Sequence, residues 1–324
     1  MKILAVGDLH GKIPVKLKKE AGKVDLILCT GDFANANRIR KIIFKTWGDK
    51  KWFEMVGLKK AREYEKESFD SGLDILKQIN KLAKKMFFIW GNTDFYKEHT
   101  TSEPPVIMPG YYNEKIKELK NLVLIDKKKR RINNFDVIGY GGYVDATEFI
   151  KNPIDKDKKK QEKRLKRYEK DKDDLKKLFS KKKPKNFIFI IHCPPPYGYF
   201  DNVKLRSSPM YGKNVGWEPY NDIIKKTLSS PHLKRCGLFG FSGCSEKSES
   251  CIATFCNLKV AVYFSDIKKY KPLLVVCGHI HENQGKKRLG RSWIINTGAA
   301  CDGKAAIIET DDKKKKIKNI RFLR

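Results

Sequence analysis

The sequence centres on the stretch Lys271-Pro272-Leu273-Leu274-Val275-Val276-Cys277-Gly278-His279-Ile280-His281-Glu282. Its continuous apolar run, bounded by Pro and Gly and partly β-branched, predicts a buried strand. Gly278 permits a tight exit from that strand. His279 and His281 follow at i and i+2, so they lie close together but point in different directions. This spacing suits ligands of two neighbouring metal ions, although a pair of histidines near a strand end is more often structural when it stands alone.

Matching polar residues follow other predicted strands. Apolar runs at residues 2–7, 24–29, 86–90 and 187–191 each end in a short turn. The order strand, helix, strand at the start of the chain predicts a parallel sheet that carries ligands at its C-terminal edge. The residues at these strand ends are Asp8 and His10, then Asp32, then Asn92, then His192.

Together with the two histidines of the central stretch, these side chains form a set of oxygen and imidazole ligands. Such ligands suit Mn, Fe, Zn, Ni or Co. Seven ligands are too many for one ion and about right for two, so one carboxylate must bridge the pair. Asp32 is the natural candidate, because its strand lies between the other contributors.

The ordered motifs D-x-H, G-D, G-N, H and G-H-x-H resemble those of the calcineurin-like metallophosphoesterase superfamily, over essentially the whole chain. The resemblance implies an α/β fold, a four-layer αββα sandwich, with two divalent metals at the C-terminal strand ends. Manganese is the first expectation, and Fe, Zn, Ni or Co are alternatives. One metal would be held by Asp8, His10, Asp32 and His281, and the other by Asp32, Asn92, His192 and His279. The expected catalytic residues are Asp32, Asn92 and His192.

Two cations about 3.5–4 Å apart lower the pKa of a bridging water and clamp phosphoryl oxygens during in-line attack. The expected activity is therefore the hydrolysis of phosphoester bonds by a metal-bridging hydroxide. Many phosphatases of the superfamily carry a histidine after the Asn, where this chain has Thr93. A threonine hydroxyl is a poor general acid. This pattern resembles the G-N-x-D branch of small bacterial and archaeal phosphodiesterases, so we expect phosphodiesters to be preferred.

The residues after Asn92 leave some roles open. Thr93 and Asp94 are expected to lie at the substrate. Asp94 either orients the Asn92 loop or caps a turn. His99 is either a substitute acid or a surface histidine.

The length and composition of the chain limit the class of protein to which it can belong. The 324 residues are 40% apolar, enough for a core, and we expect a single metallophosphoesterase domain over residues 1–324. No run of about 18 apolar residues occurs, so we expect no membrane partner. The N-terminal run lacks the length and the cleavage site of a signal peptide, which favours a cytoplasmic location. The sequence does not predict the oligomeric state.

The chain is strongly basic, with 70 Lys and Arg against 38 Asp and Glu and a formal net charge of +32. Either a compositional bias towards surface lysines or the binding of an anionic polymer explains this excess. Residues 151–185 are predicted to be a basic helical insertion, either a solvated arm or a lid that meets an anionic partner. Nucleic acid is therefore a candidate partner, and a nuclease acting on RNA or DNA is the alternative enzyme.

Residues 229–265 are predicted to be a second insertion, which contains a group of cysteines. Their spacing matches no usual zinc pattern, so reduced thiols, a structural zinc or a disulfide pair are all open. The cysteines in this insertion are Cys236, Cys244, Cys251 and Cys256. A final alternative is a non-catalytic scaffold that uses the same fold for protein contacts, as the retromer scaffold subunit of this superfamily does.

Overall fold

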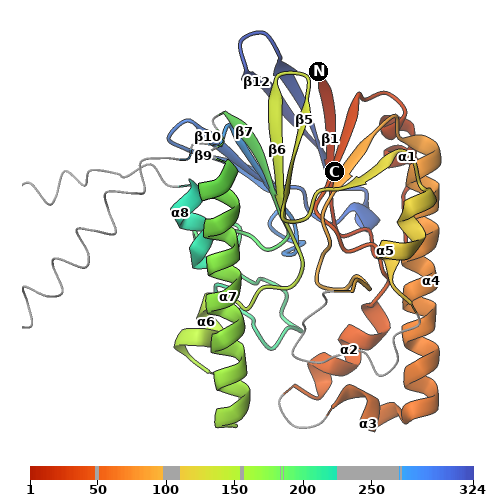
Figure 1. Ribbon diagram of the computed structural model, residues 1–324. Coiled ribbons are helices and arrows are strands. Elements are labelled where there is room, and N and C mark those ends of the chain that lie inside the picture. Colours follow the sequence, from red (N-terminus) through yellow and green to blue (C-terminus); the bar gives the residue numbers. More distant parts are fainter. Residues whose placement is uncertain are drawn as a thin grey trace, which may run out of the picture.

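The computed structural model describes residues 1–47, 51–97, 110–153, 157–182, 184, 186–224, 270 and 272–324, and these form two six-stranded sheets (Figure 1). The first sheet has the strand order β12 (Lys316–Leu323), β11 (Ala305–Asp311), β1 (Lys2–Val6), β2 (Leu26–Cys29), β3 (Met86–Phe88) and β4 (Leu122–Leu124). The second has the order β5 (Lys128–Ile132), β6 (Phe135–Tyr140), β7 (Phe187–Ile191), β8 (Leu274–Cys277), β10 (Ser292–Asn296) and β9 (Gly285–Leu289).

The described helices lie outside this pair of sheets, on both faces and below the strands (Figure 1). They are α1 (Val15–Ala21), α2 (Asn37–Lys45), α3 (Trp52–Val56), α4 (Leu58–Leu82), α5 (Tyr112–Lys115), α6 (Thr147–Lys151), α7 (Lys158–Lys182) and α8 (Asn221–Ile224). Short 3₁₀ turns lie at Ile116–Glu118, Glu218–Tyr220 and Ala300–Asp302. None of the described helices is both long enough and apolar enough to cross a bilayer.

Three apolar layers separate four layers of secondary structure. Alternate residues of β1 show why: Ile3 and Ala5 face the core between the sheets, whereas Leu4 and Val6 face helices α1 and α4. The same alternation in β7 places Ile188 and Ile190 between the sheets and its other residues against α7. Strands buried on both faces read as continuous apolar runs, which is what the sequence shows. The predicted αββα sandwich is confirmed.

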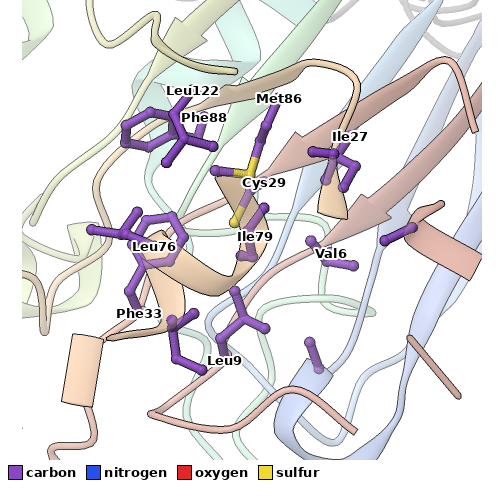
Figure 2. Close-up of a cluster of buried hydrophobic side chains, with 14 of the residues drawn as sticks. Val6, Leu9, Ile27, Cys29, Phe33, Leu76, Ile79, Met86, Phe88 and Leu122 are labelled. Atoms are coloured by element: carbon purple, nitrogen blue, oxygen red, sulfur yellow. The ribbon is translucent and has the colours of Figure 1, made fainter. Parts of the chain in front are cut away.

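Helix α4 closes the face of the first sheet. Its buried residues Leu76 and Ile79 pack on Ile27, Phe33 and neighbouring side chains in the cluster shown in Figure 2. Burial of one such side chain stabilises the fold by about 1.5–3 kcal/mol. This packing holds β2 and the turn that follows it, which carries Asp32, against a long and regular support.

Helix α7 closes the face of the second sheet and corrects one prediction. Tyr168, Leu175 and Phe179 are buried in the core over that sheet, so the prediction that this segment is a solvated arm is wrong. Leu165, on the same helix, is exposed. The Arg167 guanidinium also donates two hydrogen bonds to the buried Asp145 carboxylate, at 2.6 and 2.9 Å, which ties α7 to the loop after β6.

The sequence pattern does not predict two of the strands, because their composition is mostly charged. β5 reads Lys-Lys-Arg-Arg-Ile and β9 reads Gly-Lys-Lys-Arg-Leu, and neither shows the apolar run of a buried strand. Both lie at the edges of the second sheet, where charged side chains are common because they oppose pairing with another chain. The predicted cysteine-containing segment 229–265 and His99 lie outside the described residues, and the single domain over residues 1–324 stays a prediction.

Candidate metal centre

The parallel pairings decide where the candidate ligands meet. β1 runs parallel to β2, β2 to β3, and β7 to β8. The C-terminal ends of these strands therefore lie at one edge of the sandwich, and the predicted ligands lie in the loops directly after them. The structure brings all seven of them together at this edge, namely Asp8, His10, Asp32, Asn92, His192, His279 and His281.

One cluster gathers Asp8, His10 and His281. His281 Nε2 lies 3.1 Å from His10 Nε2 and 3.3 Å from Asp8 Oδ1. Ligand atoms of these three side chains all lie within 4.8 Å of one another. That spacing is close to the spread of ligands around one cation, since imidazole and carboxylate bonds to a transition metal are about 2.0–2.2 Å long.

A second cluster gathers Asn92, His192 and His279. Asn92 Oδ1 lies 2.7 Å from His192 Nε2 and 2.9 Å from His279 Nδ1. The two imidazole nitrogens are 3.2 Å apart. These side chains come from the ends of β3, β7 and β8, so two sheets supply one cluster.

Asp32 lies between the clusters. Its Oδ2 is 3.9 Å from His10 Nε2 in the first cluster and 3.6 Å from His192 Nε2 in the second. Its other oxygen, Oδ1, accepts a hydrogen bond of 2.9 Å from the Thr93 backbone N–H. One carboxylate oxygen is thus held by the protein and the other is directed at both groups of ligands.

The tautomers of two histidines are set by backbone carbonyls. His192 Nδ1 lies 2.8 Å from the Thr30 carbonyl oxygen, and His10 Nδ1 lies 3.2 Å from that of Ala34. Each Nδ1–H donates there, so the neutral ring presents the lone pair of Nε2 to the cluster. At His192 this lone pair faces the amide oxygen of Asn92, which is also an acceptor, at 2.7 Å. A divalent cation bound to both atoms would remove the repulsion between these two acceptors, so this donor set fits a divalent metal.

Burial keeps other imidazoles in the form that a metal requires. Burial lowers the pKa of His279 to about 3. Burial also lowers the pKa of His10. At His281 burial acts in the same direction, but the Asp8 carboxylate outweighs it and raises the pKa. Neutral imidazole is the form that binds metal, and His279 and His10 hold it at neutral pH.

Four candidate ligands have backbone conformations that L-residues rarely adopt. The φ angles of Asp8, His10, Asp32 and His279 are 56°, 42°, 61° and 68°. This left-handed region costs roughly 1–2 kcal/mol for a residue with a Cβ. Strain of this kind persists where surrounding contacts enforce it, and it concentrates at functional sites.

Two glycines allow the loops to approach so closely. A Cβ on Gly278 would lie 2.5 Å from Asp8 Oδ2, and a Cβ on Gly91 would clash with the Asp32 carboxylate. At the Gly278 position the Asp8 carboxylate instead accepts the His279 backbone N–H, at 3.0 and 3.1 Å. The glycines of the G-H-x-H and G-N motifs are therefore required by the packing of one ligand loop on another.

Asp94 supports the loops from below the centre. It is fully buried, and its oxygens accept backbone N–H groups of Asp32 at 2.9 Å, Phe33 at 2.7 Å and Gly91 at 2.8 Å. Burial, reinforced by the charge of Asp32, raises the pKa of Asp94 to about 7, although these N–H groups favour its ionised form. Both oxygens of this buried carboxylate accept backbone N–H groups, which leaves neither of them directed at a substrate. We therefore propose that Asp94 positions the ligand loops, in place of the substrate contact expected from the sequence.

Thr93 lies closer to the centre. Its backbone N–H holds Asp32, as described above, and its hydroxyl oxygen is buried without a protein hydrogen-bond partner. This residue directly follows the Asn of the G-N motif. The side chain contributes no titratable group there.

The loop 194–217 is bound to the last motif. Glu282 accepts the backbone N–H groups of Lys204 and Leu205 at 2.7 and 2.9 Å, and Asn283 donates to the Asn202 carbonyl at 2.7 Å. Ile280, between the two histidines, packs in an apolar cluster with Val203, Met210 and Val215, and with Ala146 and the partly buried Trp47 and Phe149. The loop therefore forms one wall beside the candidate ligands.

A family model for the calcineurin-like phosphoesterases matches residues 1–234. The chain belongs to this family. The matched part of the chain contains the motifs of Asp8, Asp32, Asn92 and His192, and the G-H-x-H stretch lies beyond it. The family generally binds a dimetal centre, and the geometry above brings the last two histidines to the same place as the others.

Three solved structures are similar to this chain over most of its length. One that is 17% identical covers 100% of this chain and 99% of its own, with a TM-score of 0.53. Protein TT1561 of Thermus thermophilus is 15% identical, with 100% and 99% coverage and a TM-score of 0.40. A dimetal phosphatase from Danio rerio is 10% identical, with 95% and 92% coverage and a TM-score of 0.42. The first of these shares the fold of this chain. A comparison with curated protein sequences gives no match.

The sequence gives no signal for one cation whose charge reaches the candidate ligands. The positive charge of Arg40, on α2, contributes a lowering effect to the pKa values of both His10 and His281. Its Nη2 donates a hydrogen bond of 2.8 Å to Asn37 Oδ1, which holds the half-buried guanidinium on its helix. Among 70 basic residues nothing in the sequence distinguishes this one, because its position depends on how α2 packs below the strand ends.

Proposed function

We propose that this chain hydrolyses phosphoester bonds, preferentially phosphodiesters, with two divalent cations. The observation that supports this most is the position of Asp32 Oδ2, 3.9 Å from a histidine of one cluster and 3.6 Å from a histidine of the other. The first cation would be held by Asp8, His10, Asp32 and His281, and the second by Asp32, Asn92, His192 and His279.

When bound, the two cations supply a water of lowered pKa and neutralise charge on the phosphoryl oxygens. The number of carboxylates among the ligands sets the net charge of the loaded site. Asp8 and Asp32 bring the only carboxylates to the proposed ligand set, and the other five ligands are neutral imidazoles and an amide. A loaded site would therefore keep a surplus of positive charge, which attracts and orients a phosphate anion.

The described residues at the candidate centre offer little help to a poor leaving group. The Thr93 hydroxyl is a poor acid, and Asp94 is occupied by backbone N–H groups. The proposed imidazole ligands direct their nitrogens at one another and at Asp32. A leaving oxygen would have to depart as an anion, which favours activated esters and explains the proposed preference for phosphodiesters with good leaving groups.

We expect purified protein loaded with Mn²⁺ to cleave bis(p-nitrophenyl) phosphate with kcat/KM at least about 100-fold above that for an alkyl monoester, because general acid catalysis is worth about 10²–10⁴-fold. Parallel samples loaded with Fe²⁺, Zn²⁺, Ni²⁺ and Co²⁺ would identify the preferred metal. Equal rates on good and poor leaving groups would contradict the proposal. If the protein cleaves neither ester with any of these metals and binds a protein partner tightly, the non-catalytic scaffold is favoured instead.

Arg40 provides a test of how charge near the ligands attracts the substrate. We expect Arg40→Ala to lower kcat/KM severalfold, mainly through KM, because it removes a cation that would attract an anionic substrate. Steady-state kinetics on the same diester would measure this. Arg38→Ala is the matched control: it lies on the same helix, but Arg38 is exposed and pairs with Glu67 at 2.9 Å. If both variants lose activity equally, Arg40 has no special role.

A further inference from the structure

A second concave site lies away from the metal centre. Edge strands β9 and β12, one from each sheet, border a groove of about 330 Å³. Its apolar floor includes Leu273, Trp293, Ile317 and Ile320, and its polar lining residues are Lys286, Arg288, Arg291, Lys316, Lys318 and Asn319. No acidic side chain is among the described residues that line it.

The groove lies at the opposite end of the strands from the candidate metal ligands. Leu273 directly precedes β8, whereas His279 follows it. At about 3.3 Å per strand residue, these two positions are roughly 20 Å apart. An occupant of the groove would therefore be a separate ligand, or a distant part of a long one. This inference does not depend on the proposed hydrolytic activity.

The pairing of β9 with β10 places cations around an aromatic ring. Arg288 is directly opposite Trp293 in the ladder. The Arg288 guanidinium lies 5.6 Å from the centre of the Trp293 ring, and Lys286 Nζ lies 5.7 Å from it. Lys286 also donates a hydrogen bond of 2.9 Å to the Ile320 carbonyl oxygen, so it spans the groove from one sheet edge to the other.

The described lining of the groove holds several cations and no carboxylate, although Asp311 on the neighbouring strand β11 is directly opposite Lys316. Lys286, Arg288, Lys316 and Lys318 are exposed cations on two facing edges, and Arg291 adds a fifth while it donates to Asn186. The repulsion between them falls when an anion enters. A linear anion with several charges suits the groove better than a single phosphate, because the cations are spread along two strands.

We propose that this groove binds single-stranded nucleic acid. Lysines and arginines would neutralise successive phosphates, and the half-buried Trp293 with the planar Arg288 guanidinium would offer a surface on which a base stacks. Single-strand sites in proteins combine these two elements. A concave site between two strand edges admits one strand, whereas a duplex would contact only its rims.

The test is fluorescence anisotropy of a labelled oligo(dT) and oligo(rU) of about 15 nucleotides, within the range of single-strand site sizes. Full-length protein would be titrated with Mn²⁺ and again with EDTA, at salt concentrations from about 50 to 200 mM. We expect Arg288→Ala/Lys318→Ala to bind at least tenfold more weakly. We also expect its slope of log K against log salt to fall by about 1.4, since each phosphate contact contributes about 0.7 for single strands.

The matched control is Lys77→Ala/Lys81→Ala, which removes the same charge from exposed positions of α4. It should bind like the unmodified protein, and thermal melts should show that both variants are folded. An equal loss in the two double variants would show that overall charge, not the groove, binds the strand, and would overturn the proposal. So would the absence of binding at about 150 mM salt, or tighter binding of a duplex or of inorganic polyphosphate.

Discussion

Asp32→Asn is expected to lower kcat/KM for a phosphodiester by about a thousandfold, on the order of 4 kcal/mol of transition-state stabilisation. The amide keeps the shape of the side chain and its acceptor for the Thr93 N–H. It removes the negative charge that lies 3.9 and 3.6 Å from His10 and His192, between the two clusters. Metal analysis of the purified variant should show fewer than two bound ions, because a neutral amide is a weak bridging ligand.

Asp173→Asn is the control for this result, since Asp173 is an exposed carboxylate on α7. It should retain both ions and full activity. If Asp32→Asn retains two ions and loses less than tenfold in kcat/KM, then Asp32 does not bridge and the assignment of ligands to two metals is wrong. Because activity and metal content are measured separately, a defect of chemistry can be distinguished from a defect of metal binding.

Asp94→Ala is expected to lower the free energy of unfolding by about 3–5 kcal/mol, because each buried donor left without a partner costs about 1–3 kcal/mol. The substitution leaves the backbone N–H groups of Asp32, Phe33 and Gly91 without their hydrogen-bond acceptor. Urea denaturation monitored by circular dichroism would measure this loss. Activity should fall as well, because the Asp32 turn loses the contact that holds its left-handed backbone.

Asp70→Ala is the control for stability. Asp70 is an exposed carboxylate that pairs with Lys66 at 2.7 Å within α4, and such pairs contribute only about 0.3–0.5 kcal/mol. A structural role alone would change stability without changing metal affinity, so isothermal titration with Mn²⁺ on the folded variant is the second measurement. Unchanged stability and unchanged metal affinity in Asp94→Ala would contradict the positioning role.

Several features of the fold are predictable because they depend on short stretches of sequence. Continuous apolar runs such as 187–191 indicate strands buried on both faces, and the structure places them in the sheet interiors. The charged edge strands β5 and β9 are not predictable, since strands at sheet edges need no apolar pattern. The sequence of helix α7 leaves a solvated arm open because its few apolar residues are separated by lysines and arginines, yet three of them suffice to bury one face.

The sequence alone determined the order of the ligand motifs and therefore the family, because residue types and their places after predicted strands are local properties. Only the tertiary structure decided that Asp32 lies between two clusters and that the Asp94 carboxylate accepts backbone N–H groups. It also brought together β9 and β12, whose cations form a groove that no single stretch reveals. The reason is physical. Distances between side chains that are far apart in the chain depend on how strands pair and how layers pack, and no single segment determines either of these.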